Sequence, residues 1–567
     1  MSLALVLLVF ATAKLLAPVL QAVILWLGAR WCSIAEVGYG RALLTCIAST
    51  VICLATSLAQ NAAQLAVEEQ IRNGMGSRWL TFQAAMPHAF FCLQLLLVWP
   101  CAKWLLRAGW IPAAMATVLM FLGGYACNLP LHAGEEAMAG VYPVESDCMA
   151  PTACGPHLSI PCKNCGLEHE VSMSGLAWST LRARLLRPVH CPNCGYELPL
   201  PTDVPLQRED QLLVDKLVRP QRWDLVMFQP ADRPARKAGG VVQRLVGLPG
   251  EKVEILAGGV FINGHRLLVA PSEAADKWVL VHDTLHTPTR PVPDGPKWQA
   301  AESPSVWKWS GGKWIFHSAK TATGSLAFSG RIADTHPYDA TDPARLPALD
   351  ENAPLVGDVR LETTLESVSG SGTLTFEWQY RGQRAQATIA VSGKATLRVS
   401  EFAEENFAVE SASQTVPADV PGGLFTTNRV GLAVRNGYAF LLYGGSVLAS
   451  LPLGGDDPQA AKSRQRRFSG PCRLGIVAAH CSLTLARILL YRDVYYRNPE
   501  EMSGIPAQRA VGLAEHPVTL ENDAWYLLGD DSTCTGDSRF TGPVRSDALV
   551  GIARWIFWPP ERWRQFH

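Results

Sequence analysis

Val241-Val-Gln-Arg-Leu-Val-Gly247-Leu-Pro-Gly250-Glu251 is the stretch of this sequence that decides the fold. Its apolar first half is typical of a buried strand, and Gly-Leu-Pro-Gly is typical of a tight turn. The chain continues through Lys252–Leu256 and a second apolar run that ends at Asn263-Gly264, a strong hairpin signal. The pattern predicts antiparallel β structure built from short strands.

Three other segments accompany this stretch along the chain. They are Ser146-Asp-Cys148-Met-Ala-Pro-Thr152, Arg222-Trp-Asp-Leu-Val-Met-Phe228 and Leu527-Leu-Gly-Asp-Asp531-Ser-Thr-Cys-Thr535-Gly-Asp537-Ser-Arg539. Together the four segments resemble the type I signal peptidases, membrane-anchored serine endopeptidases that remove leader peptides. That family has a Ser-x-Ser-Met-x-Pro-Thr box after a membrane helix, a Gly-Asp-x-Val-x-Phe strand, a Lys-Arg-x-x-Gly-Leu-Pro-Gly-Asp strand and a Gly-Asp-Asn…Ser-x-Asp-Ser-Arg-x-x-Gly box. The four counterparts keep this order and cover roughly a third of the chain.

The resemblance implies a Ser/Lys dyad, and both of its positions are changed here. The second Ser of the first box, which attacks the peptide carbonyl, is replaced by Cys148, and the Lys that accepts its proton is replaced by Gln243. An amide cannot serve as a general base, whereas a thiol of pKa ~8.5 is partly ionised at neutral pH. Two hypotheses follow: an impaired or inactive homologue, or a cysteine peptidase whose base is His157, Lys216 or Lys237.

The resemblance also implies supporting roles for four residues. The Ser146 hydroxyl and the amide of residue 148 would form an oxyanion hole, and Asp537 and Arg539 would form a structural ion pair. Thr535 occupies the position of a Ser that lies beside the Lys in the family. An alternative for the aspartates is a turn-forming role without direct function.

Two CxxC motifs predict a metal site. Cys162-Lys-Asn-Cys165-Gly and Cys191-Pro-Asn-Cys194-Gly have the form of two knuckles that hold zinc tetrahedrally with four thiolates. Such a closed site has no open position for chemistry, so the zinc is expected to be structural, with no cofactor needed for catalysis. Two short disulfides are the alternative, because an external location is oxidising.

The first quarter of the chain is predicted to lie in a membrane. Residues 1–132 hold only 10 of the 100 charged residues. Four apolar segments of membrane-spanning length lie in this part of the chain, at roughly 3–29, 42–67, 79–102 and 108–131. The loops after the first and third segments carry four Arg or Lys residues (Arg30, Arg41, Lys103, Arg107), against two after the second. The positive-inside rule then puts both termini, and the soluble domains, outside an inner membrane.

About 240 residues separate the two halves of the peptidase resemblance. Segments such as Val359–Leu365, Gly372–Tyr380 and Arg429–Val434 alternate at period two, which predicts an antiparallel β-sandwich. Its last strands resemble, at modest specificity, the concanavalin-like jelly roll of laminin G and lectin domains. One hypothesis is that this insert binds a glycan or a protein, and the other is that it is a spacer. Cys472 and Cys481 are candidates for a disulfide across adjacent strands.

These observations predict a multi-domain membrane protein. The expected order is a four-helix transmembrane region (1–132), a first core part (133–270) with a zinc-ribbon-like insert (155–200), an inserted β-sandwich (271–496) and a second core part (497–567). Expected partners are exported preproteins or their leader peptides, and membrane lipid. Fifty basic against fifty acidic residues argue against nucleic-acid binding.

Overall fold

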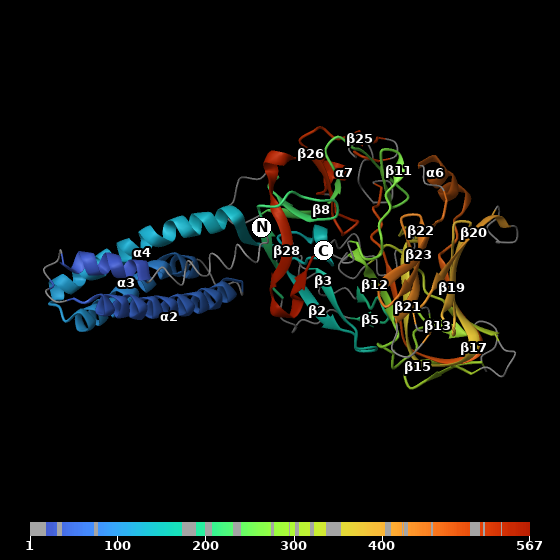
Figure 1. Cartoon of the computed structure of the whole chain (residues 1–567), viewed down its shortest axis with the longest axis horizontal. Coiled ribbons are helices and arrows are strands. Elements are labelled where there is room, and N and C mark those ends of the chain that lie inside the picture. The colour runs from blue at the N-terminus through green and yellow to red at the C-terminus, as the bar shows by residue number, and fades with distance from the viewer. Residues whose placement is uncertain are drawn as a thin grey trace. The chain divides into compact units, whose positions relative to one another are not determined.

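The structure is a computed structural model of the whole chain (Figure 1). It describes residues 19–30, 34, 37–72, 78–172, 189–198, 207–230, 240–273, 277–293, 295–300, 306–317, 323–335, 353–402, 410–421, 423–424, 429–454, 458–498, 511–513, 516–534 and 536–566. The chain forms two compact units, Met1–Gly140 and Val141–His567.

The first unit is helical. Its helices are Val19–Arg30, α2 (Tyr39–Arg72), α3 (Arg78–Leu106) and α4 (Trp110–Met138). Two stretches among the described residues, Tyr39–Gln64 and Met86–Leu106, are long and apolar enough to cross a membrane. Val19–Arg30 and Trp110–Leu122 are shorter apolar helices, and residues 1–18 of the first predicted segment lie outside the described part. The length and composition of the described helices therefore support two spans rather than the predicted four.

The second unit is mostly β, as predicted, and its first sheet joins the two ends of the peptidase resemblance. This eight-stranded sheet has the order β1-β6-β28-β7-β8-β26-β27, with β29 paired to β28. The strands are β1 (Ala139–Pro143), β6 (Gln211–Asp215), β7 (Leu225–Phe228), β8 (Val241–Gly247), β26 (Ala524–Leu528), β27 (Val544–Arg545), β28 (Leu549–Trp558) and β29 (Arg564–Gln565). All seven residues of β8 are buried, which explains its nearly continuous apolar run.

A second sheet has four strands in the order β11-β10-β9-β25. Three of them, β9 to β11, directly follow β8 in the chain. It contains β9 (Lys252–Leu256), β10 (Gly259–Ile262), β11 (His265–Arg266) and β25 (Val518–Thr519). Asn263 and Gly264 have φ values of 54° and 82°, so the predicted Asn-Gly hairpin turn is confirmed. The two sheets form what is called here the peptidase-like core.

Short elements follow the first box. Within the first box, Asp147–Met149 form the 3-10 helix η1. The cysteine motifs lie in two hairpins. These hairpins pair β2 (His157–Pro161) with β3 (Glu168–Ser172) and β4 (Val189–His190) with β5 (Glu197–Leu198).

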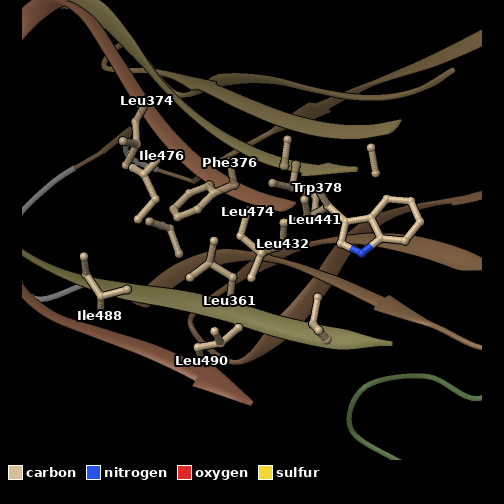
Figure 2. Packing of buried hydrophobic residues seen from close by; sticks show 14 of the residues in the cluster. Leu361, Leu374, Phe376, Trp378, Leu432, Leu441, Leu474, Ile476, Ile488 and Leu490 are labelled. Atoms are coloured by element: carbon tan, nitrogen blue, oxygen red, sulfur yellow. The ribbon is translucent and has the colours of Figure 1, made fainter. Parts of the chain in front are cut away.

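The insert is a thirteen-stranded antiparallel sheet system whose main path is β13-β16-β24-β17-β18-β19-β20. Its strands are β12 (Val279–Asp283), β13 (Trp298–Ala300), β14 (Trp307–Ser310), β15 (Lys313–His317), β16 (Thr323–Phe328), β17 (Val359–Tyr380), β18 (Gln383–Ala390), β19 (Lys394–Phe402), β20 (Glu410–Asp419), β21 (Arg429–Arg435), β22 (Tyr438–Tyr443), β23 (Ser446–Pro452) and β24 (Arg473–Arg492). Side chains at alternating positions of β17, β21 and β24, among them Leu361, Phe376 and Ile476, fill its core (Figure 2). Short helices α6 (Pro458–Arg467), α7 (Ser538–Thr541), η6 (Ser546–Ala548) and η7 (Pro560–Arg562) complete the chain.

Two features of the insert differ from expectation. Val359–Leu365 and Gly372–Tyr380 belong to one long strand, because register shifts at Thr364/Leu365, Leu365/Ser367 and Gly370/Thr373 take the place of a turn. The predicted Cys472–Cys481 pairing is wrong, since both thiols are free. Cys472 immediately precedes β24 and Cys481 lies within it, and nine residues of extended chain span about 30 Å, beyond the reach of a disulfide.

Candidate active site and four-cysteine cluster

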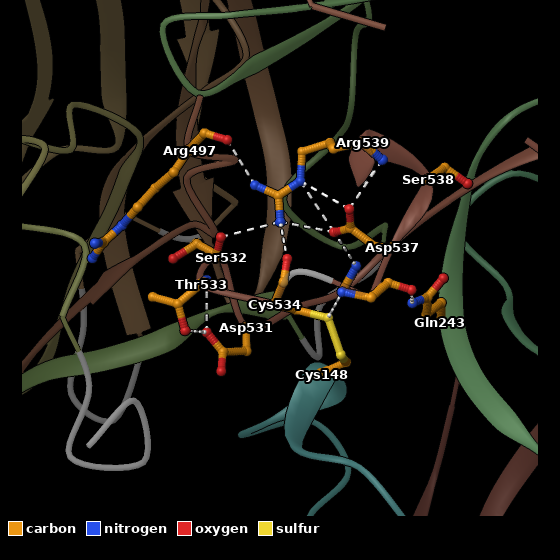
Figure 3. A network of polar contacts seen from close by, with 12 residues as sticks. Cys148, Gln243, Arg497, Asp531, Ser532, Thr533, Cys534, Asp537, Ser538 and Arg539 are labelled. Atoms are coloured by element: carbon orange, nitrogen blue, oxygen red, sulfur yellow. Dashed lines mark hydrogen bonds and ion pairs between the residues drawn. A yellow bond between two sulfur atoms is a disulfide. The ribbon is translucent and has the colours of Figure 1, made fainter. Parts of the chain in front are cut away.

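Cys148, which the resemblance places at the position of the nucleophile, is joined by a disulfide to Cys534 (Figure 3). The first comes from η1 and the second from the loop after β26, at a sequence separation of 386. The same two segments are tied through the backbone, because the Asp531 amide donates to the Cys148 carbonyl at 2.9 Å. In this form Cys148 carries no free thiol that could attack a carbonyl.

Gln243, which the resemblance places at the position of the general base, is fully buried on β8. Its Nε2 donates to the Gly536 carbonyl at 2.9 Å, and its Oε1 has no hydrogen-bond partner among the described residues. A Cβ on Gly536 would lie 3.8 Å from the Cys148 sulfur and 3.9 Å from the Cys534 sulfur. Gln243 is therefore held next to the disulfide as a hydrogen-bond donor.

Asp537 and Arg539 form the ion pair that the resemblance implies. Both side chains are fully buried, with Nη2 of Arg539 2.7 Å from Oδ2 of Asp537. Asp537 caps α7 by accepting from the Arg539 amide, and Arg539 donates to the carbonyls of Ser532, Cys534 and Arg497. This pair fixes the loop that carries Cys534.

A second buried ion pair links β8 to the last box. Arg244 on β8 donates Nε to Oδ1 of Asp530 at 2.8 Å, and its Nη2 lies 2.5 Å from Oδ2. The Thr152 hydroxyl donates to Oδ2 of the same carboxylate at 2.6 Å. Asp530 thus has a direct structural role, beyond the turn-forming role considered from sequence.

Asp531 lies beside the disulfide and is buried. Burial, together with the negative charges of Asp334 and Asp147, raises the pKa of Asp531 to about 6, although Thr533 donates two hydrogen bonds to its Oδ1. Asp334 belongs to the insert and accepts from the Ser532 hydroxyl, from Nε of Arg497 at 2.8 Å and from Nη1 of Arg492 at 2.8 Å. The insert therefore contributes to the polar network around the candidate site.

Ser146, His157 and Lys216 are the other predicted site residues that the structure describes. Ser146 is the N-cap of η1, and its side chain makes no capping hydrogen bond. Nδ1 of His157 lies 2.8 Å from the Gly155 carbonyl, and the Lys216 ammonium lies 5.4 Å from the centre of the Tyr142 ring. Thr535 and Lys237 lie outside the described residues.

The four predicted metal ligands do come together. The sulfurs of Cys162, Cys165, Cys191 and Cys194, the four-cysteine cluster, all lie within 4.8 Å of one another, and all four residues are buried. Two sulfur–sulfur distances between the knuckles are 3.7 Å for Cys162–Cys194 and 3.6 Å for Cys165–Cys191.

This geometry fits a tetrahedral metal. Thiolates 2.3 Å from a zinc ion lie about 3.8 Å from each other, close to the observed spacing. None of the four forms a disulfide. Gly166 and Gly195 have φ of 74° and 72°, the left-handed conformation that lets each knuckle turn and its Gly amide donate to the carbonyl of the first Cys. The cluster can therefore hold a metal ion.

Sequence reasoning missed Cys534, Arg244 and Asp334. Cys534 was visible in the last box as a cysteine without an assigned partner, and Arg244 followed the altered base position directly. Asp334 carried no signal, because only the tertiary fold brings this part of the insert to the site.

Part of the chain is similar to known signal peptidases. Residues 201–295 match the family model described as signal peptidase, peptidase S26. The chain is also 35% identical over 68 residues to a probable signal peptidase I-2 from Synechocystis sp.. That match covers 11% of this chain and 31% of the relative, so the chain spans about a third of the length of the curated relative it matches.

Solved structures of carbohydrate-active proteins are similar to part of the chain. The laminarinase from Rhodothermus marinus is 12% identical, with a TM-score of 0.27, over 38% of this chain and 98% of its own. The endo-β-1,3-glucanase from Pyrococcus furiosus is 8% identical, with a TM-score of 0.26, over 44% of this chain and 100% of its own.

Proposed function

We propose that this protein is a membrane-anchored relative of signal peptidase I that binds leader peptides of exported preproteins at its peptidase-like core. The match at residues 201–295 supports this assignment, as do two apolar helices of membrane-spanning length near the N-terminus. The proposed ligand is an extended segment with small residues near the position of the scissile bond. Such a segment would pair its backbone with an edge of the core as an added strand.

In its disulfide form the protein is proposed to bind these peptides without cleaving them. The single observation that supports this proposal is the bond between the Cys148 and Cys534 sulfurs. Cleavage needs a nucleophile and a group that accepts its proton. The sulfur of Cys148, the proposed nucleophile, is bound in the disulfide. The proposed position of the proton acceptor holds the buried Gln243, whose side-chain amide donates to the Gly536 carbonyl.

A cysteine peptidase that works after reduction is the second candidate. Cys148 remains at the nucleophile position of the box, and the Asp537–Arg539 pair still supports the loop opposite it. A dithiol would reduce the disulfide to two thiols while becoming a disulfide itself. After losing its proton to water, Cys148 would attack the peptide carbonyl and form a thioester as the C–N bond breaks and the amine leaves with a proton; water would then hydrolyse the thioester. Ser146 and the amide of residue 148 are the proposed oxyanion donors in this case.

A cleavage and binding assay in detergent separates these proposals. Wild type, Cys148→Ala and Cys534→Ala are incubated with a labelled preprotein, with and without dithiothreitol, and binding of a labelled leader peptide is measured by anisotropy. Saturable binding without cleavage by any form supports the first proposal. Cleavage by reduced wild type and by Cys534→Ala, but not by Cys148→Ala, supports the second. Cleavage by oxidised wild type that Cys148→Ala abolishes contradicts the first, and absence of binding contradicts both.

Three further assignments belong to this proposal. The four-cysteine cluster is proposed to hold one structural zinc ion, because its spacing suits tetrahedral thiolates. The helical unit is proposed to cross an inner membrane several times, with Val141–His567 on the extracytoplasmic side. The insert is proposed to be a jelly-roll-like β-sandwich with a glycan or protein ligand, or a spacer without one, because its antiparallel strands enclose one extended apolar core.

A further inference from the structure

Each knuckle of the four-cysteine cluster has an asparagine directly before its second cysteine. These residues, Asn164 and Asn193, are 3% and 0% exposed. A buried amide must find partners for both its carbonyl oxygen and its NH₂ group, since an unsatisfied buried polar group is destabilising.

One side of each amide faces the sulfurs of the opposite knuckle. Nδ2 of Asn164 lies 3.8 Å from the Cys194 sulfur, and Nδ2 of Asn193 lies 3.7 Å from the Cys165 sulfur. An N–H donor stabilises a thiolate more than a neutral thiol, because the hydrogen bond is then charge-assisted. Both asparagines are therefore oriented to support sulfurs that bind a metal.

The same two amides bind the insert at the end of its first strand, β12, and in the loop that follows. Asn164 donates to the Arg290 carbonyl at 2.9 Å and accepts from the Arg290 amide at 2.8 Å. Asn193 donates to the His286 carbonyl at 2.9 Å and accepts from the Asp283 amide at 2.6 Å. The two knuckles thus hold opposite ends of one segment, residues 282–290.

This segment is connected to the centre of the insert. The Asp283 carboxylate accepts from Nε of Arg487 at 2.9 Å and from its Nη2 at 2.5 Å, and Arg487 lies on β24. Thr284 accepts from the Ile488 amide on the same strand at 2.8 Å. A continuous set of hydrogen bonds therefore leads from the cysteine sulfurs to the longest pair of strands in the large sheet.

We propose that the metal-loaded four-cysteine cluster fastens the insert to the two hairpins that carry the cysteines, and that Asn164 and Asn193 are the positioning residues that couple metal occupancy to the order of residues 282–290. The proposal rests on the proposed zinc and is independent of peptidase activity. Loss of the metal would let the knuckles separate, which would carry the two amides away from their backbone partners.

Hydrogen exchange of the full-length protein in detergent tests the coupling. Metal content is measured in parallel, and zinc affinity by competition with a chromophoric chelator. Chelation of wild type is expected to raise exchange in 282–290 at least tenfold, while β21 and β22 keep their protection. Asn164→Ala and Asn193→Ala are expected to retain zinc with roughly 10- to 100-fold lower affinity. In both alanine variants, hydrogen exchange of residues 282–290 should already be faster than in wild type before chelation. Chelation should then raise it little further.

Two further variants sharpen the test. Asn193→Asp keeps the oxygen that accepts from Asp283 but replaces the donor that faces Cys165 with a negative oxygen, so zinc affinity should fall more than in Asn193→Ala. Gln386→Ala removes a side-chain amide elsewhere in the insert, where it donates to Glu377, and should leave 282–290 protected. The proposal is overturned if wild type binds no metal, if chelated wild type keeps 282–290 protected, or if both alanine variants exchange like wild type.

Discussion

Cys148 and Cys534 come from opposite ends of the peptidase resemblance and are joined by a disulfide at the position where the family's nucleophile would act. The bond closes a loop of several hundred residues that includes the four-cysteine cluster and the whole insert. We expect non-reducing peptide mapping by mass spectrometry to find the linked peptides. Cys534→Ala should make Cys148 react with iodoacetamide without reductant, whereas Cys472→Ala, which removes a free buried thiol, should not. Unlinked peptides in protein purified without reductant would contradict the structure.

Restoring the family's dyad tests whether the core is still a peptidase scaffold. We expect Cys148→Ser combined with Gln243→Lys to give leader-peptide cleavage that wild type lacks, because Asp537, Arg539 and the proposed oxyanion donors are unchanged. The lysine must become neutral on burial, and the complete burial of position 243 favours this.

Each single substitution should show less than about a hundredth of the double variant's rate, since dyad members act as a unit. The rate is measured with a labelled preprotein in detergent. A double variant that folds and binds zinc but cleaves nothing would show that the peptide-binding surface has itself diverged.

The Arg244–Asp530 pair should be important for stability. Asp530→Asn leaves the buried guanidinium without its counter-charge and is expected to lower the free energy of unfolding by about 3 kcal/mol. Asp419→Asn is the matched control, because its pair with Lys394 is largely exposed and should give no measurable change. Denaturant unfolding of both variants, followed by tryptophan fluorescence, compares them. Equal denaturant midpoints for the Asp530→Asn and Asp419→Asn variants would show that the buried pair contributes little to stability.

Asp531 should make stability depend on pH. Because the pKa of Asp531 is raised to about 6 in the folded state, the folded protein binds more protons than the unfolded chain between about pH 4 and 6. This contribution to stability is present below pH 4 and is lost as the pH rises through 6. Asp531→Asn keeps the oxygen that accepts from Thr533 and should raise stability at pH 8 by up to about 3 kcal/mol. Thermal unfolding from pH 4 to 8 measures this; an unchanged profile would contradict the prediction.

The proposed topology predicts how spheroplasts respond to added protease. With Val141–His567 outside the inner membrane, protease added to spheroplasts should digest this unit. A cytoplasmic marker protein should survive in the same sample. Digestion of the unit only after lysis would reverse the proposed orientation.

The sequence alone was enough to locate the elements whose signals are local. Turn chemistry at Asn263-Gly264, the apolar run of β8 and the two CxxC motifs each depend on a few adjacent residues, so the hairpin, the buried strand and the cysteine cluster could be predicted. The order of the four boxes predicted the mostly β core, and the ion pair of Asp537 with Arg539 followed from the resemblance.

Only the tertiary structure decided which distant groups meet. The partner of Cys148 among fifteen cysteines, the carboxylate that pairs with Arg244, and the arrival of Asp334 at the site all depend on chain paths of hundreds of residues. The same is true of the link from Asn164 and Asn193 to residues 282–290. A disulfide, a buried ion pair or an amide bridge needs matching positions within a few ångströms, and residue type and local periodicity do not specify those positions.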